Sequence, residues 1–261
     1  MLGIFNEKLV NAPKELKSPA CLNSCSKGKE RDEMMKDLMR FGNWWNGLWM
    51  RFGNGDGVLG YAPSMDGDHN HNQRLFSVLD DIYCVFLGEL HNLSMLNKQY
   101  GLSKGGNEAM FIIQAYRTLR DRAPYPAHQV LKELEGSFGF LIYDNRDRTL
   151  FLASASNAHI PLYWGIAPHA SLVISENLHL VKATCAKSFA PFPTGCMFHS
   201  QHGLMSFEHP TKKMKPMPRI DSQGVICGAI FNVDSQSNIH LMPRVGSEAN
   251  WANWIGDDKL A

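Results

Sequence analysis

The sequence predicts one α/β domain in which β-sheets lie between layers of helices. Two apolar runs, residues 138–143 and 150–153, flank the polar turn DNRDR, and this pattern is typical of a β-hairpin. Both runs are apolar at nearly every position, so we expect both faces of their sheet to be covered. Other strands precede and follow a central helical block without a break in composition. One layered domain therefore explains the order of elements better than two domains.

The other strands are expected where short apolar runs end at turn residues. The chain opens with such a run within residues 1–10, and residues 161–165 follow the hairpin after a loop of small and polar residues. The segment Phe-Pro-Thr-Gly at residues 192–195 predicts a turn that leads into another strand. The remaining predicted strands are residues 58–62, 82–87, 172–175, 196–199 and 225–233.

Residues 107–122 form the clearest predicted helix. Asn107 is suited to cap its first turn, Glu108 to the positive end of the helix dipole, and Pro124 prevents its extension. Shorter helices are expected at residues 30–40, 129–135 and 177–185, and one more ends near residue 100. An apolar stripe at helical spacing predicts the buried face of the long helix, and it consists of Ala109, Ile112, Ile113, Tyr116 and Leu119.

We place a single domain at residues 1–235 and a C-terminal tail at residues 236–261. A tryptophan-rich insert near residues 40–57 interrupts this domain. In the insert, Arg-Phe-Gly-Asn occurs twice around three tryptophans, and the Gly and Asn residues disfavour a long helix. The tryptophans either fold back onto the sheet, which we favour, or form an exposed patch for a protein partner.

Composition excludes several classes of function. Of the 261 residues, 44% are hydrophobic and 20% are charged, with a formal net charge of +1, so no global field attracts nucleic acid or an anionic membrane. No apolar run reaches the roughly 20 residues of a transmembrane helix. Residues 1–17 lack the apolar stretch of a signal peptide. We expect a cytoplasmic location, with the nucleus as the alternative.

Cysteines and histidines predict neither a metal site nor a cofactor. The six cysteines are scattered through the chain, which disfavours a disulfide framework. Cys21 and Cys25 have no second pair at ligand spacing, and His69 and His71 have no carboxylate or cysteine at fixed spacing.

Five segments follow one another along the chain: MLGI, which contains Leu2 and Gly3, then FLGELHN, the hairpin segment from LEGSFGF to PLYWG, SENLHLVKATC and FPTGCMF. In this order they make residues 1–200 resemble the glutaminase domain of class II glutamine amidotransferases. The family's counterparts are Met-Cys-Gly-Ile, Asn-Gly-Glu-Ile-Tyr-Asn, a Gly-x-Phe-Ala-Phe strand leading to Pro-Leu-Tyr, Ser-Glu and Phe-Pro-Pro-Gly. This resemblance implies an N-terminal-nucleophile hydrolase fold of the glutaminase type, with four αββα layers.

Two shorter motifs are Tyr100-Gly101-Leu102 and Leu119-Arg120-Asp121-Arg122, with MLGIF and RDRAPYPA in support. Taken by themselves, the arginines of the second motif either form a binding site or, as we favour, pair with Asp121 at the negative end of their helix. Together these motifs resemble, more closely still, the signature of the plant aluminium-induced, or stem-specific, proteins. The resemblance implies a plant protein induced by stress, wounding or hormone.

The nucleophile and the oxyanion hole of the glutaminase reaction are both altered. The family's nucleophile is a cysteine freed at the mature N-terminus, and its α-amino group acts as the base. Leu2 takes its place here and, being bulky, should also keep Met1 in the chain. Leu87 replaces the asparagine whose side-chain amide stabilises the oxyanion, whereas Gly88 and Glu89 remain. Losing one such donor costs about 100- to 1000-fold in rate.

The groups that recognise the substrate are also changed. The strand Leu-Gly-Tyr-Ala-Pro at residues 59–63 lacks the arginine that holds the glutamine carboxylate in the family, although Arg74 lies nearby in the sequence. Gly105-Gly106 stands where the family has Ser-Asp, whose aspartate reads the substrate amine. Ser154-Ala155 replaces Arg-Asp in the later loop. The apolar residues of the scaffold remain while the polar groups that the reaction needs are lost, which is the pattern of an active site that has lost its activity.

Two classes of function follow, and both are kept. In the first, the protein is a non-catalytic, stress-responsive module that acts by binding, as a homodimer, and its tryptophan-rich insert contacts protein partners. In the second, another nucleophile in the same pocket supports a changed hydrolysis or amidotransfer. A third possibility is that Arg74, Gly88 and Glu89 still bind a small amino acid without turnover.

Pocket geometry distinguishes these classes. A cysteine within hydrogen-bond reach of a histidine favours an enzyme, whereas an apolar plug of Leu2 and Leu87 favours binding. We expect a buried, inert thiol at each candidate cysteine. The candidate nucleophiles are Cys84, Cys185 and Cys196, and the candidate bases are His91, His159 and His199.

Overall fold

The computed structural model describes residues 1–18, 47–53, 56–62, 73–102, 106–122, 126–167, 170–220 and 224–234. Two large antiparallel sheets and a two-stranded ribbon make up its β-structure. The expected helix at residues 30–40, the cysteines and histidines considered as metal ligands, and the C-terminal tail at residues 236–261 lie outside these residues.

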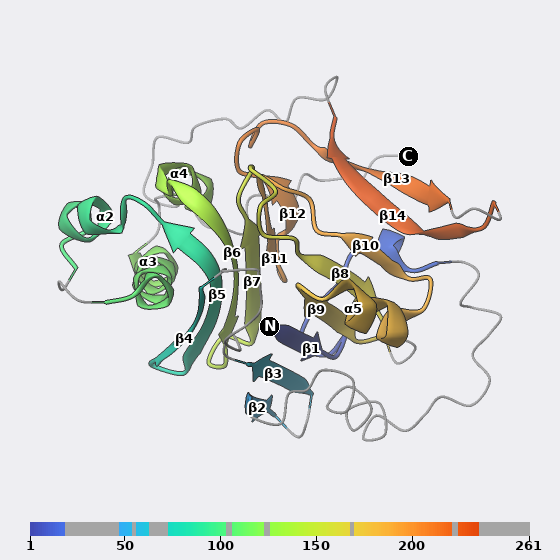
Figure 1. Ribbon diagram of the computed structural model, residues 1–261, viewed down its shortest axis with the longest axis horizontal. Helices are drawn as coiled ribbons and strands as arrows, with labels where there is room; N and C mark the ends of the chain where they lie inside the picture. The colour runs from blue at the N-terminus through green and yellow to red at the C-terminus, as the bar shows by residue number, and fades with distance from the viewer. Residues whose placement is uncertain are drawn as a thin grey trace, which may run out of the picture.

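Sheet A contains six antiparallel strands, and the first strand of the chain lies near its centre (Figure 1). Here Leu2 pairs with Gly60 on one side and with Ser175 on the other. The second half of the tryptophan-rich segment forms the edge strand of this sheet. In sheet order the strands are β10 (Phe189–Pro191), β8 (Tyr163–Ile166), β9 (Leu172–Ser175), β1 (Leu2–Phe5), β3 (Gly57–Tyr61) and β2 (Leu48–Phe52).

Sheet B also contains six strands, and the predicted hairpin forms its centre. The two apolar runs pair in register from Gly139 opposite Ser154 to Asp144 opposite Thr149, which confirms the hairpin. Burial of every residue of β7 confirms that both faces are covered. In sheet order the strands are β12 (Gly203–Ser206), β11 (Cys196–His199), β7 (Thr149–Ser154), β6 (Gly136–Asp144), β5 (Ile82–Leu90) and β4 (Arg74–Leu79).

Helices cover the outer face of each sheet, so the layers follow the order αββα (Figure 1). On sheet B lie α2 (Leu93–Gln99), α3 (Glu108–Arg122) and α4 (Ala127–Glu133). On sheet A lies α5 (Leu178–Cys185), and a short 3-10 turn, η1 (Lys14–Leu16), follows β1. The four predicted layers are confirmed. Within the described residues, no helix is long and apolar enough to span a bilayer.

Local sequence signals explain where the helices begin. The side-chain oxygen of Asn107 accepts a hydrogen bond from the backbone N–H of Met110 at 2.9 Å, which confirms the predicted cap of α3. Asn177 caps α5 in the same way, through the N–H groups of His179 and Leu180. The predicted apolar stripe of α3 packs against sheet B.

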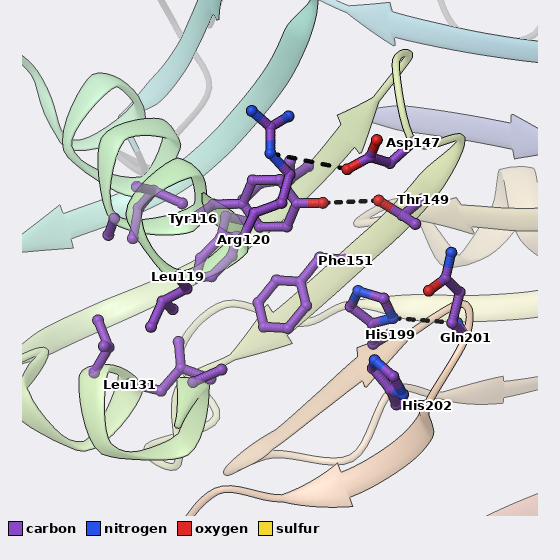
Figure 2. A pocket seen from close by; sticks show the side chains of 16 residues that line it. Tyr116, Leu119, Arg120, Leu131, Asp147, Thr149, Phe151, His199, Gln201 and His202 are labelled. Carbon is purple, nitrogen blue, oxygen red and sulfur yellow. Dashed lines mark hydrogen bonds and ion pairs between the residues drawn. The ribbon is translucent and has the colours of Figure 1, made fainter. Parts of the chain in front are cut away.

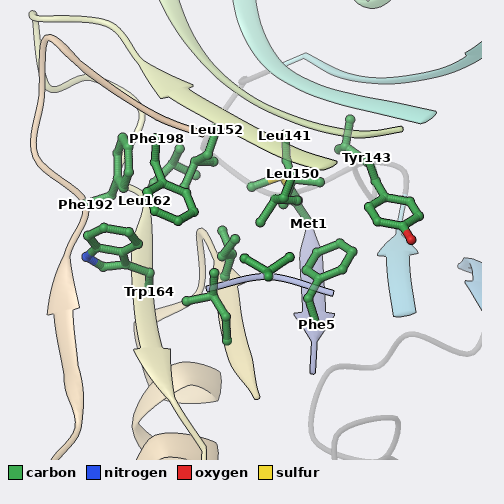
Figure 3. Close-up of a cluster of buried hydrophobic side chains, with 14 of the residues drawn as sticks. Met1, Phe5, Leu141, Tyr143, Leu150, Leu152, Leu162, Trp164, Phe192 and Phe198 are labelled. Atoms are coloured by element: carbon green, nitrogen blue, oxygen red, sulfur yellow. The ribbon is translucent and has the colours of Figure 1, made fainter. Parts of the chain in front are cut away.

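The largest apolar core lies between the two sheets (Figure 3). Met1 and Phe5 enter it from β1, and Leu141 and Tyr143 enter it from β6. The ring of Trp164 contacts three phenylalanines at centroid distances of 5.0 to 5.5 Å. One of these, Phe231, comes from the ribbon of β13 (Met214–Ile220) and β14 (Ile226–Val233), so the ribbon closes one side of the core.

Candidate functional site

The replaced nucleophile position is buried under a helix. The side chain of Leu2 is fully buried and packs with Ile4 and Val181 between β1 and α5. Leu87 instead belongs to the core between the sheets. The two residues therefore do not form the single apolar plug expected from the sequence. Because side chains alternate along an extended chain, Met1 lies on the opposite face of the sheet from Leu2 and belongs to the same core as Leu87.

An ion cluster surrounds the amino group of Met1. Its ammonium donates to Oε1 of Glu176, and the guanidinium of Arg74 lies 3.6 Å from the same oxygen. The hydroxyl of Ser175 donates to the Met1 carbonyl at 2.7 Å. Burial lowers the pKa of the Met1 amino group, and the Glu176 carboxylate opposes this effect. Arg74 is thus brought beside the old nucleophile position, as its candidate role required, but it faces a carboxylate of the protein itself.

Gly88 no longer offers a free oxyanion donor. Its backbone N–H donates to the carbonyl of Gln73 at 2.8 Å. The glycine has φ +98°, and a Cβ built on it would lie 2.0 Å from the carbonyl oxygen of Ser137. L-residues with a side chain rarely adopt such a backbone conformation. The geometry of the sheet therefore accounts for this glycine without any catalytic role.

Two further residues of the predicted pocket lie apart from this cluster. The carboxylate of Glu89 is mostly exposed and lies 3.4 Å from Nδ1 of His91. Gly106 precedes α3, where its nearest side chain is Met110. Its neighbour Asn107 contacts the hydroxyl of Ser77 at 3.1 Å, on the face of sheet B that the helices cover. The structure therefore brings Arg74, Leu87 and Gly88 to the old cleft, with Glu89 at its exposed rim and Gly106 elsewhere.

A loop after β7 contributes two apolar side chains to the core between the sheets. Ile160 and Leu162 are 3% and 2% exposed and belong to the same core as Met1 and Leu87. A Cβ on Gly139 would lie 3.0 Å from Leu162 and 3.1 Å from Ile160. Apolar side chains of this loop therefore pack directly onto β6 at Gly139.

One histidine considered from the sequence meets a hydroxyl at the rim of the old cleft. Nδ1 of His159 lies 2.9 Å from the hydroxyl oxygen of Ser137, and the side-chain amide of Asn157 donates to the same oxygen at 2.8 Å. Sequence reasoning did not single out Ser137, because the contact joins a strand to a loop about 20 residues away.

The described cysteines are buried and form no disulfide. Burial raises the pKa of Cys84, and it raises that of Cys196 to about 12. A thiol with such a pKa is almost entirely protonated near neutral pH and is a poor nucleophile. The expected buried thiols at Cys84, Cys185 and Cys196 are confirmed.

The Tyr-Gly-Leu motif fastens the end of α2 to its neighbours. The hydroxyl of Tyr100 donates to the Glu133 carboxylate of α4 at 2.7 Å, and its ring packs edge-on against Phe111 of α3. Gly101 has φ +64°, and the N–H of Leu102 returns to the carbonyl of Asn97 at 2.8 Å. These are the features of a glycine cap at a helix end.

The Leu-Arg-Asp-Arg motif fastens α3 to the turn of the central hairpin. Arg120 donates to Asp121 at 2.8 Å, as we favoured from the sequence, and also to Asp144 at 2.7 Å. Asp144 is fully buried and its other oxygen accepts backbone N–H bonds from Arg146 and Asp147. The two family motifs therefore lie on the helix-covered side of sheet B: the first joins α2 to α3 and α4, and the second joins α3 to the end of β6.

Comparison with known protein families gives a match over most of the chain. Residues 2–233 match the family described as aluminium induced protein. The chain belongs to the aluminium-induced protein family. It is also 37% identical over 159 residues to stem-specific protein TSJT1 of Nicotiana tabacum, covering 59% of this chain and 99% of that protein.

Members of the amidotransferase group are more distant relatives of this aluminium-induced protein. Asparagine synthetase B [glutamine-hydrolyzing] of Escherichia coli (strain K12) is 26% identical over 126 residues, which cover 47% of this chain and 21% of that protein. Glutamine phosphoribosylpyrophosphate amidotransferase from B. subtilis superposes with a TM-score of 0.49 at 13% identity, over 79% of this chain and 48% of that chain. The chain thus spans about a fifth of the first protein and half of the second.

Two charged residues at these sites were not predicted as functional. Glu176 completes the Ser-Glu pair of the amidotransferase resemblance, so the motif itself was the available signal. Asp144 opens the polar hairpin turn, and a turn aspartate is ordinarily exposed. Its full burial depends on Arg120, which comes from another element.

His199, a candidate base, lies beside aromatic rings at the end of β11. Its ring packs against Phe151 at 6.1 Å and against His202 at 4.5 Å. Burial, and secondarily the charge of His202, lower the pKa of His199 from 6.5 to about 4, and burial also lowers the pKa of His202. The imidazole is therefore neutral near pH 7.

Replacing His199 with Gln is expected to make the free energy of unfolding depend less steeply on pH below about 6.5. Between pH 6.5 and about 4 the unfolded chain binds a proton that the folded His199 excludes, so the free energy of unfolding falls as the pH is lowered. With a discount for partial exposure, this contributes about 1–3 kcal/mol. Urea unfolding at several pH values measures it, with His209→Gln as the exposed-histidine control. Equal slopes in wild type and His199→Gln would contradict the assignment.

Proposed function

We propose that this protein is a non-catalytic, glutamine amidotransferase-like protein that acts through binding in plant stress or hormone responses. The observation that carries the proposal is the state of position 2, where an aliphatic side chain is fully buried between β1 and α5. No atom at this position is able to attack an amide.

The rest of the old cleft supports the same proposal. The N–H of Gly88 is bonded to Gln73, so a tetrahedral intermediate would find neither of the family's two oxyanion donors. Ile160 and Leu162 occupy the space above Gly139. Arg74 faces Glu176, and this arrangement disfavours the capture of a free amino acid through its carboxylate.

Restoring the nucleophile is expected not to restore the reaction. Neither the wild type nor Leu2→Cys should release ammonia from glutamine above the protein-free rate. One reason is that the new thiol lies under α5, and the other is that loss of a single oxyanion donor already costs about 100- to 1000-fold. Ammonia release is measured together with intact mass, which reports whether Met1 is present in each sample.

Ile4→Cys is the matched control, because Ile4 lies on the same face of β1 and is equally buried. Both new thiols should react slowly with a thiol reagent in the folded protein and rapidly in urea. Glutamine turnover by the wild type, or by Leu2→Cys but not Ile4→Cys, would overturn the proposal of a non-catalytic cleft.

A hydrolase of changed chemistry is the second candidate function, and the contact between Ser137 and His159 favours it. A hydroxyl 2.9 Å from an imidazole nitrogen is the pairing that activates a serine nucleophile. If this candidate holds, hydrolysis of amide or ester substrates by the pure protein should disappear in Ser137→Ala and persist in Ser156→Ala, which removes an exposed hydroxyl from the neighbouring loop. If Ser137→Ala changes no activity, this candidate is excluded.

A further inference from the structure

A cavity lies on the face of sheet B that the helices cover. It has a volume of about 410 Å³ and is bordered by α3 and α4 on one side and by β6, β7 and β11 on the other (Figure 2). This volume falls within the range of pockets that hold drug-sized ligands. Met1 and Leu87 belong to the core on the opposite face of the sheet, so this cavity shares no wall of side chains with them.

Apolar and aromatic groups form most of the cavity wall. Ile112 and Leu131 approach from the helices, and Phe140 and Phe151 approach from the sheet. The rings of Phe151 and Tyr116 lie 6.3 Å apart at an angle of 45°. Figure 2 shows Tyr116, Phe151 and His199 around the same space. A flat aromatic ligand would contact ring faces and edges here, as aromatic side chains do in protein cores.

The charges around the cavity are compensated. Arg120 is the arginine of the lining, and its guanidinium already donates to Asp121 and Asp144 and lies 3.8 Å from Asp147. His199 and His202 have lowered pKa values because of burial, so neither supplies a positive charge near pH 7. Among the lining residues that the structure describes, an anionic ligand would find no spare cation, and an ion buried without a partner is costly.

One polar pair inside the cavity is able to orient a ligand. The hydroxyls of Tyr116 and Thr149 lie 2.7 Å apart. Two hydroxyls that share one hydrogen bond keep a second O–H for another acceptor. A carbonyl, ether or similar neutral oxygen of a ligand suits this position.

We propose that the cavity between α3, α4 and sheet B binds an uncharged, largely aromatic small molecule, and that Tyr116 and Thr149 orient a hydrogen-bond acceptor where the ligand carries one. The Leu-Arg-Asp-Arg motif builds this site, because Leu119 and Arg120 line it and Arg120 holds the hairpin turn at its rim through Asp144 and Asp147. The site does not depend on the fate of the glutaminase cleft, so either proposal stands if the other fails.

The test uses two fluorescent probes that differ by one charge. N-phenyl-1-naphthylamine is neutral, and 8-anilinonaphthalene-1-sulfonate carries the same rings with a sulfonate. Titration of the full-length protein should show saturable binding of the neutral probe at one molecule per chain. The sulfonate should bind at least tenfold more weakly, because the lining has no uncompensated cation.

A variant with a larger side chain in the cavity tests whether the neutral probe binds there. Ala115→Phe inserts a ring into the lining and should weaken binding of the neutral probe at least tenfold. Ala183→Phe, on the exposed side of α5, should leave binding unchanged. If Ala115→Phe does not fold, Leu119→Trp, which enters from the partly exposed edge, replaces it. Unchanged neutral-probe binding in the folded filling variant, or equally tight binding of the sulfonate, would overturn the proposal.

Discussion

Replacing Arg120 with Met is expected to lower the free energy of unfolding by roughly 3–5 kcal/mol. Asp144 is fully buried, and its carboxylate oxygen lies 2.7 Å from Nη1 of Arg120. Removal of the guanidinium leaves that carboxylate in the protein interior without its cation. The two backbone N–H groups that also bind Asp144 compensate only part of the charge. Urea unfolding followed by circular dichroism measures the loss.

Arg117→Met is the matched control on the same helix. Arg117 pairs with Asp80, but the two side chains are 41% and 59% exposed, and an exposed ion pair contributes about 0–1 kcal/mol. The double variant Arg120→Met/Asp144→Asn should recover much of the stability, because its amide is uncharged and still accepts the turn hydrogen bonds. Similar losses of unfolding free energy in Arg120→Met and Arg117→Met would show that burial of Asp144 does not increase the contribution of its ion pair to stability.

The fold was largely predictable because its strongest elements carry their signals locally. The hairpin is visible as two apolar runs around a polar turn, and α3 is visible from the Asn107 cap and the apolar stripe. The strand β13 was missed because its sequence contains Pro216 and Pro218. Prolines disfavour a strand prediction, although an edge strand tolerates them where no ladder donor is needed. The strand β4 was missed as well, since it follows a polar loop.

Residues of the candidate sites could be named from the sequence only where a single position carries a group that the reaction requires. Leu2 and Leu87 were singled out through the family resemblance, because each stands where that family has a side chain with an indispensable atom. The direction in which Leu2 points, the partner of the Gly88 N–H and the burial of Asp144 all depend on contacts between distant segments. The cavity under α3 and α4 is likewise made by two helices and three strands, and no short motif describes it.

Gly88→Ala is expected to prevent folding or to lower the free energy of unfolding by at least about 4 kcal/mol, a loss beyond that of most single substitutions. A Cβ at this position would lie 2.0 Å from the backbone carbonyl oxygen of Ser137 on the paired strand. The residue also has φ +98°, where an L side chain adds strain. Soluble yield and urea unfolding of the purified variant measure the effect.

Gly101→Ala separates the steric effect from backbone strain alone. Gly101 also has a positive φ, +64°, but nothing lies within 4 Å of its Cβ position, so about 1–2 kcal/mol is expected for the left-handed conformation. A stable Gly88→Ala protein would mean that β5 and β6 have room to separate, and the retained glycine would then need another explanation. If Gly88→Ala fails as expected, the glycine of the amidotransferase motif is required by the sheet itself. Its presence is then explained by the packing of β5 against β6 and is no evidence for the glutaminase reaction.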